Sequence, residues 1–145
     1  MPEQETIERA REDQREGKAP STQAGEFVRE EMHHVREGKH GAASAKQAIA
    51  IGLSKARRAG VKLGQPKGSA SLRKKAAQDT AASKKKNHKP SRTRSRATSG
   101  ALKREPTSAA SHKSLSAQAK KSAAKRGPAA RRASAVKAAR ARKAA

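Results

Sequence analysis

The chain has 145 residues, no cysteine and a formal net charge of +24. The absence of cysteine excludes disulfides and thiolate metal sites. Leu, Ile, Val and Phe together number only 13 residues, far below the ~20% under which a highly charged chain is expected to be disordered. These values exclude a core of ordinary size and predict that most of the chain is disordered. With the helical patterns described below, the expected fold is all-α: a short helical hairpin in an otherwise largely disordered chain.

The charge is distributed unevenly along the chain. Residues 1–37 contain ten acidic and six basic residues, whereas residues 38–145 contain thirty basic residues and only two acidic ones, Asp79 and Glu105. A long segment of one sign repels itself unless a polyanion neutralises it. Nucleic acid is the commonest cellular polyanion, so the charge pattern favours a nucleic-acid partner.

The first predicted element is an acidic charged helix within residues 1–20. It spans residues 2–16 and stops at Gly17, with Pro20 shortly after. Ile7 and Ala10 are its only apolar side chains. A helix that is polar on nearly all sides has little surface to bury, so its stability alone is expected to be low.

Residues 21–63 predict a helical hairpin. In its first helix, Ser21 or Thr22 is the expected N-cap and Gly38 ends it. Apolar residues at three- and four-residue steps form one stripe on this helix: Ala24, Phe27, Val28, Met32 and Val35.

The second hairpin helix has clear boundary signals. Ser44 and Gln47 form a capping-box pattern at its start, and Gly60 ends it. Gly52 would let the two helix backbones approach closely. Some forty residues are marginal as an independent fold, so the hairpin is also expected to support a homodimer.

Residues 64–145 predict a disordered basic tail rich in Ala, Lys, Arg and Ser. Residues 115–126 and 129–144 have high intrinsic helix propensity, but repulsion among Lys and Arg is expected to keep them mostly coil in water. Basic clusters recur through the tail and can neutralise phosphate oxygens. The predicted nucleic-acid-binding residues of the tail are Lys84, Lys85, Lys86, Arg92, Arg94, Arg96, Lys120, Lys121, Lys125, Arg126, Arg131, Arg132, Arg140, Arg142 and Lys143.

A second candidate surface lies on the second hairpin helix. Lys55, Arg58 and Lys62 recur at three- and four-residue steps, and Arg57 is adjacent. This stripe is compatible with a helix that faces a nucleic-acid groove. It is equally compatible with a solvated basic face near a helix C-terminus.

The missing residue types indicate how the chain would bind. One aromatic residue cannot build a stacking platform for unpaired bases, and no finger or basic zipper motif is present. Phosphate contacts carry no base information, so we expect DNA binding without sequence specificity, with histone-like compaction or bridging. The alternatives are an RNA- or ribosome-associated protein, and a protein-interaction module that the basic tail anchors.

No catalytic or cofactor site is expected. The serines lack a rigid partner constellation, and the adjacent histidines His33 and His34 point about 100° apart on a helix, so no metal site is predicted. No apolar run approaches the ~18 residues of a membrane span, and no secretory signal is apparent. The expected location is cytoplasmic and nucleoid-associated.

Two resemblances add to this interpretation. The run from Gly38-Lys39-His40-Gly41 through Lys46-Gln47-Ala48-Ile49-Ala50-Ile51-Gly52-Leu53-Ser54-Lys55-Ala56-Arg57 resembles a signature of small uncharacterised bacterial proteins that share a domain of unknown function. This resemblance covers about residues 20–63 and implies a bacterial origin but no activity. Residues 64–145 resemble in composition the Ala/Lys-rich tails of linker histones and bacterial histone-like proteins, which implies DNA compaction. They lack the regular Pro-Ala-Lys repeats of those tails.

Overall fold

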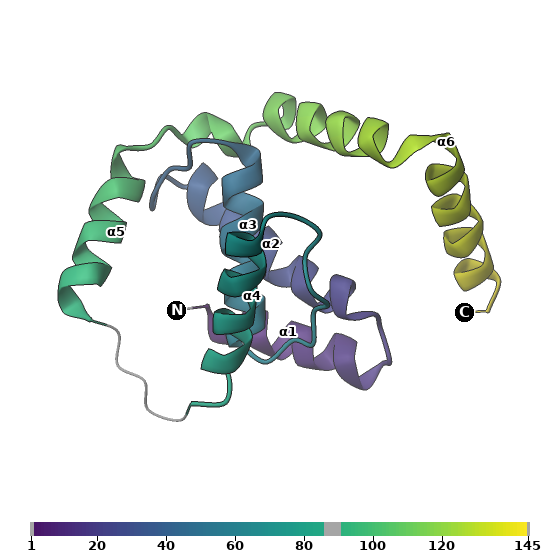
Figure 1. Ribbon diagram of the computed structural model, residues 1–145, viewed down its shortest axis with the longest axis horizontal. Coiled ribbons are helices and arrows are strands. Elements are labelled where there is room, and N and C mark those ends of the chain that lie inside the picture. The colour runs from purple at the N-terminus through teal and green to yellow at the C-terminus, as the bar shows by residue number, and fades with distance from the viewer. Residues whose placement is uncertain (1, 86–90, 145) are drawn as a thin grey trace. The chain divides into compact units, whose positions relative to one another are not determined.

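The computed structural model describes residues 2–85 and 91–144. The regular structure of these residues is helical (Figure 1). Its elements are α1 (Gln4–Arg15), α2 (Pro20–Arg36), α3 (Ala45–Arg58), α4 (Ala70–Ala82), α5 (Arg92–Arg104), the 3₁₀ helix η1 (Thr107–Ala110) and α6 (His112–Ala144). The chain divides into two compact units, Met1–Ser111 and His112–Ala145.

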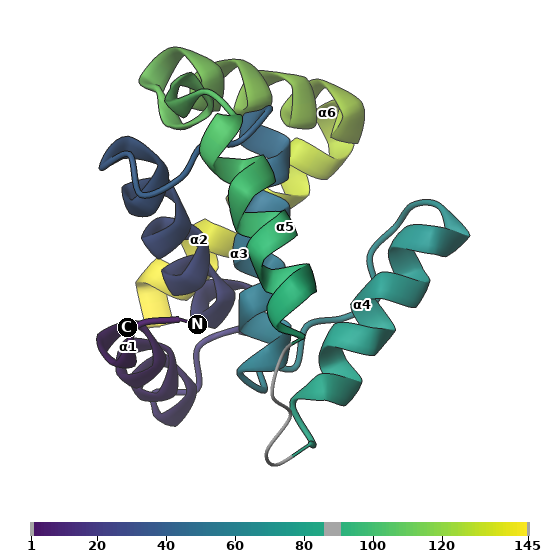
Figure 2. The ribbon, with the colours of Figure 1, turned by 90° about the vertical axis from the view of Figure 1, so that its left-hand side faces the viewer.

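The core of the first unit lies among α1, α2 and α3. Helix α2 packs against both α1 and α3, and Figures 1 and 2 show α2 and α3 side by side. Phe27 is 1% exposed and is the largest apolar side chain of this core. The buried core residues are Ala10, Ala24, Phe27, Ala56 and Val61, with Ile7, Leu53 and Leu63 packed against them. Helix α1 therefore packs its two apolar side chains on the hairpin, with Ala10 buried and Ile7 partly buried, instead of standing alone.

The predicted helix ends are largely confirmed. Gly17, Gly38 and Gly60 have φ values of 72°, 72° and 98°, the left-handed region that glycine adopts without steric cost. The predicted side-chain cap of α2 is wrong, because α2 begins at Pro20 and has no side-chain cap. Proline suits a first helical position, since its fixed φ matches the helix and the missing N–H would be unpaired there anyway.

The capping box of α3 is confirmed in a shifted form. The Ser44 hydroxyl accepts from the Gln47 backbone N–H at 3.2 Å. The Gln47 side chain accepts from the Ala43 N–H at 2.7 Å, one residue before the amide expected from the pattern.

Gly52 occupies the closest contact between the hairpin helices. A Cβ atom at this position would lie 2.7 Å from the Val28 Cα and 3.0 Å from the Phe27 carbonyl oxygen. Real Cβ atoms do not come so close to backbone, so only glycine allows this separation. The prediction that Gly52 permits close approach of the helices is confirmed.

The prediction that the chain is largely disordered is wrong, because α4, α5 and α6 are formed in the expected tail. Local factors account for these helices. The Ser69 and Ser91 hydroxyls accept from the Leu72 and Arg94 amides and cap α4 and α5. Ala, Lys and Arg have high helix propensity, and this preference outweighs the charge repulsion on which the disorder prediction depended.

Helix α4 is attached to α3 through a buried acidic residue. Asp79 is 3% exposed and accepts hydrogen bonds from Ser54 Oγ at 2.7 Å, Arg58 Nε at 2.9 Å and Lys75 Nζ at 2.7 Å. Burial alone would raise the pKa of Asp79, but these three donors outweigh it and lower the pKa below its ordinary value.

The segment after α5 returns to the turn between α2 and α3. Gly41 donates its N–H to the Leu102 carbonyl at 2.8 Å, and Ala42 donates to the Pro106 carbonyl at 3.0 Å. Next to these bonds, η1 packs on α2 and α3 and buries Ala109 and Ala110. Part of the expected tail therefore covers the hairpin.

The second unit is the long helix α6. It is interrupted at Gly127, where φ is 72° and ψ is 169°, and Pro128 starts the second half. The two halves match the two segments of high helix propensity. No described residue of α6 is buried, and within residues 2–85 and 91–144 no helix has both the length and the apolar character needed to cross a bilayer.

Candidate nucleic-acid interface and a buried charge cluster

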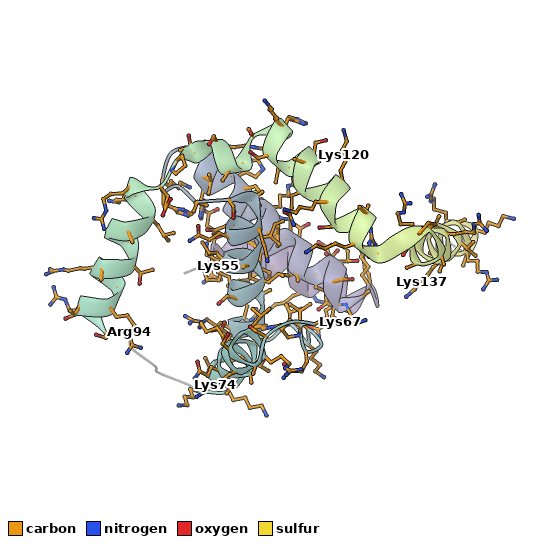
Figure 3. All side chains as sticks on the ribbon, turned by 45° about the horizontal axis from the view of Figure 1, so that its top comes forward. Lys55, Lys67, Lys74, Arg94, Lys120 and Lys137 are labelled. Atoms are coloured by element: carbon orange, nitrogen blue, oxygen red, sulfur yellow. The ribbon has the colours of Figure 1, made fainter. Side chains whose placement is uncertain are left out.

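The basic side chains of the expected tail are exposed. This holds for each predicted nucleic-acid-binding residue of α5 and α6, and for Lys84 and Lys85 after α4. Lys86 lies outside the described residues. In Figure 3 the side chains spread from α6 in all directions, with Lys120 and Lys137 labelled.

These cations lack carboxylate partners. In the part of the chain that the structure describes, no ion pair involves a basic residue after Lys75. The reason is in the composition, because Asp79 and Glu105 are the only acidic residues after residue 37. Asp79 is already paired with Lys75 and Arg58. The positive charge of α5 and α6 is thus left to solvent or to an external anion.

Helix α5 concentrates part of this charge on one face. At 100° per residue, Arg92, Arg96 and Lys103 lie within about 40° around the helix axis. Arg94 lies on the opposite side. Because α5 is formed, these three cations have a fixed spacing along a line, which a disordered chain would not provide.

The second candidate surface, on α3, is largely engaged within the fold. Lys55 pairs with Glu30 and Glu31, and Arg58 pairs with Asp79. Arg57 is 8% exposed, and its Nη2 donates to the Gly64 carbonyl at 2.8 Å. Of this group, Lys62 remains exposed and has no ion pair in the described structure.

A buried charge cluster lies between α2 and α3. The Glu31 side chain is fully buried, and Lys55 Nζ lies 2.7 Å from its Oε2 atom. The neighbouring Glu30 side chain is 2% exposed, and its Oε1 atom lies 3.4 Å from the same Lys55 Nζ. Figure 3 labels Lys55 on α3 within the helical bundle. One lysine thus faces two buried carboxylates.

Two histidines complete the cluster. His40 Nε2 lies 3.2 Å from Glu31 Oε1, and His34 Nε2 lies 3.8 Å from Glu30 Oε1. Both imidazoles are mostly buried, with 12% of the His34 side chain and 17% of the His40 side chain exposed. One ligand atom each from Glu31, His34 and His40 falls within 4.8 Å of the others, so these three residues could hold a metal ion.

The outer rim of the cluster is open to solvent. His34 Nε2 lies 2.9 Å from Glu3 Oε1, and Lys39 Nζ lies 3.3 Å from the same oxygen. The contact with His34, and then that with Lys39, lowers the pKa of Glu3 below its ordinary value. A polar depression of about 210 Å³ opens here, lined in part by Glu30 and His34.

The sequence alone did not identify this cluster. The adjacent pair His33 and His34 drew attention, but His33 is exposed. The available signal was the i,i+3 spacing of Glu31 and His34, which places them on one helix face. His40 joins them only because the chain reverses after Gly38.

Comparison with known proteins identifies a relationship for one segment. Residues 18–67 are similar to a family described as "Family of unknown function (DUF6496)". The matched segment contains α2, the turn and α3, and with them every residue of the buried charge cluster. Neither a curated protein nor a solved structure matches the chain.

Proposed function

We propose that this protein binds duplex DNA through its backbone phosphates, without reading base sequence, and that it bridges or compacts the DNA. The observation that carries the proposal is the set of exposed cations on α5 and α6 that have no internal carboxylate partner. Each cation that meets a phosphate releases condensed counterions, which favours binding at low salt.

The position of the single aromatic residue supports contacts to phosphate over contacts to bases. Phe27 is 1% exposed and belongs to the core, so it cannot stack on an unpaired base. Single-strand binding modules depend on such stacking. A duplex, which offers a dense phosphate array and needs no stacking partner, is the better match.

The arrangement of charge supports bridging. Both compact units contain unpaired cations, on α5 in Met1–Ser111 and on α6 in His112–Ala145. The chain therefore offers phosphates two sets of unpaired cations, one in each unit. Two such contacts on different duplex segments would hold the segments together, with no requirement for a particular sequence.

The test is a salt series of DNA affinity with charge-matched variants. The first variant replaces three unpaired cations of α6 with glutamine: K120Q/K121Q/K125Q. The slope of log K against log salt should become shallower by about 3, since each lost phosphate contact changes it by ~0.9. Fluorescence anisotropy with duplexes of unrelated sequence measures both the slope and the sequence preference.

The matched control replaces three cations that already have carboxylate partners: R9Q/K18Q/K39Q. It removes the same net charge, but the slope should change by less than about 1, because these cations are neutralised internally. Equal changes in slope in both triple variants would mean that binding depends on net charge alone and not on the unpaired cations of α6. Absence of DNA binding in dilute buffer would end the proposal, and stronger binding to structured RNA at equal salt would replace DNA with RNA as the partner.

A further inference from the structure

The Glu31 carboxylate is buried without adequate partners. Its side chain has no exposed surface, and neither of its oxygens accepts a hydrogen bond of ordinary geometry within the described structure. Lys55 Nζ is close to Oε2 but offers ion-pair contact only. One lysine faces two buried carboxylates, Glu30 and Glu31, and a buried charge that is not fully compensated is costly, so the site is suited to a further cationic partner at Oε1.

The orientation of His40 indicates what kind of partner fits. His40 Nδ1 lies 3.0 Å from the Gly41 carbonyl oxygen. A carbonyl only accepts, so Nδ1 carries a proton in this contact. In the neutral ring Nε2 then has a lone pair, and it lies 3.2 Å from Glu31 Oε1. The contact therefore needs either a second ring proton, on Nε2, or a metal ion between the two atoms.

We propose that Glu31, His34 and His40 bind a divalent transition-metal ion, with zinc as the best match. A ring nitrogen that binds metal while the other donates to a backbone carbonyl is the usual arrangement for metal-binding histidine. Two histidines and one carboxylate form a common ligand set for zinc, with water in the fourth position. Lys55 contacts both buried carboxylates, Glu30 and Glu31. The positive charge of the ion on Glu31 would leave more of the lysine's charge to compensate Glu30.

The distances are compatible with this assignment. Zinc–ligand distances of 2.0–2.2 Å place neighbouring ligand atoms of a tetrahedral site about 3.3 Å apart. The His40 and Glu31 ligand atoms are already 3.2 Å apart. The His34 ligand atom lies within 4.8 Å of both, and His34 would exchange its contact with Glu3 for the ion to close the site.

The site has an entry path and a clear structural role. His34 lines the open depression at the rim, so an ion can reach the cluster without unfolding of the hairpin. Glu31 and His34 lie on α2, and His40 lies in the turn before α3. The metal would tie the end of α2 to this turn and stabilise the hairpin on which the other elements pack.

The experiment titrates cobalt(II) and then zinc into tag-free, full-length protein. A chelator first removes bound metal, and high salt removes bound nucleic acid. Cobalt(II) should bind one ion per chain with the visible absorption of four-coordinate cobalt, and zinc should displace it. The variants E31Q, H34A and H40A should each weaken zinc binding at least about tenfold, the smallest cost usual even for supporting groups. The control H33A changes the exposed neighbour of His34 and should alter affinity less than about twofold.

A measurement on the unmodified protein covers the case in which a variant fails to fold. In proton NMR spectra, zinc should shift the ring signals of His34 and His40 and leave those of the other three histidines unchanged. Absence of stoichiometric binding overturns the proposal. So do shifts spread over all five histidines, or an H33A variant that weakens binding as much as H34A. The assay contains no nucleic acid, so it is independent of the function proposed above.

Discussion

The buried carboxylate of Asp79 on α4 holds the guanidinium of Arg58 on α3, with 2.9 Å between Oδ1 and Nε. Arg58 was a candidate for nucleic-acid binding in the sequence, and the structure gives it an internal partner instead. Ser54 and Lys75 donate to the same carboxylate, so one acidic residue joins α4 to the hairpin.

Removal of this carboxylate should weaken the attachment of α4. The variant D79A leaves three donors without their acceptor, and hydrogen bonds to a charged group each contribute roughly 1.5–3 kcal/mol. We expect the free energy of unfolding, measured by urea denaturation, to fall by about 2 kcal/mol or more. The control E12A removes an exposed carboxylate with no ion pair in the described structure and should change it by less than about 0.5 kcal/mol. Equal losses in both variants would contradict the role of Asp79.

The same residue predicts a pH dependence. Because its pKa is lower in the folded protein than in the unfolded chain, its ionised form favours folding. The contribution is fully present above the unfolded value of about 3.9 and is lost as the pH falls through the lower folded value. The stability difference between the wild-type protein and D79N should therefore be constant above about pH 5 and shrink below about pH 4. Urea denaturation from pH 2 to 6 measures it, and a difference that grows in acid would refute the assignment.

Alanine substitutions at two glycines inside helices should change the stability of the protein in opposite directions. In G52A the new methyl group would meet the Val28 backbone at 2.7 Å, and such overpacking costs roughly 1–3 kcal/mol. In G25A nothing lies within 4 Å of the added Cβ, so the higher helix propensity of alanine should raise stability by up to about 1 kcal/mol. Thermal unfolding followed by circular dichroism compares the two, and a stabilised G52A would show that the helices do not pack at this point.

The helix α5 should depend on its N-cap more than the packed helices do. None of the described residues of α5 is buried, so local interactions must account for most of the stability of this helix. The variant S91A removes the hydroxyl that accepts from Arg94 and should cost about 1 kcal/mol of helix stability. Faster amide hydrogen exchange confined to residues 92–104 is the expected result. The control S95A replaces an exposed serine of the same helix with alanine, which has a higher helix propensity. Amide exchange in this variant should not accelerate.

The homodimer prediction depended on an uncovered hairpin. In the structure α1 and η1 both pack on α2, and Ala109 and Ala110 are buried there. The same chain therefore supplies surface that a second copy was expected to supply. The oligomeric state stays a prediction, which analytical ultracentrifugation at two protein concentrations would test.

The amino-acid sequence by itself determined the helix ends at Gly17, Gly38 and Gly60, the cap at Ser44 and the segregation of charge. Each of these depends on residues within one helical turn or on composition alone, so it can be predicted without knowing which distant residues come into contact. Only the tertiary structure decided that Lys55 and Arg58 face carboxylates and that His40 returns to Glu31. Helical periodicity places Lys55 and Arg58 on one face of α3, but it does not reveal that acidic residues of α2 and α4 lie opposite. Such contacts depend on how the turn after Gly38 and the packing of α4 bring together residues far apart in the chain.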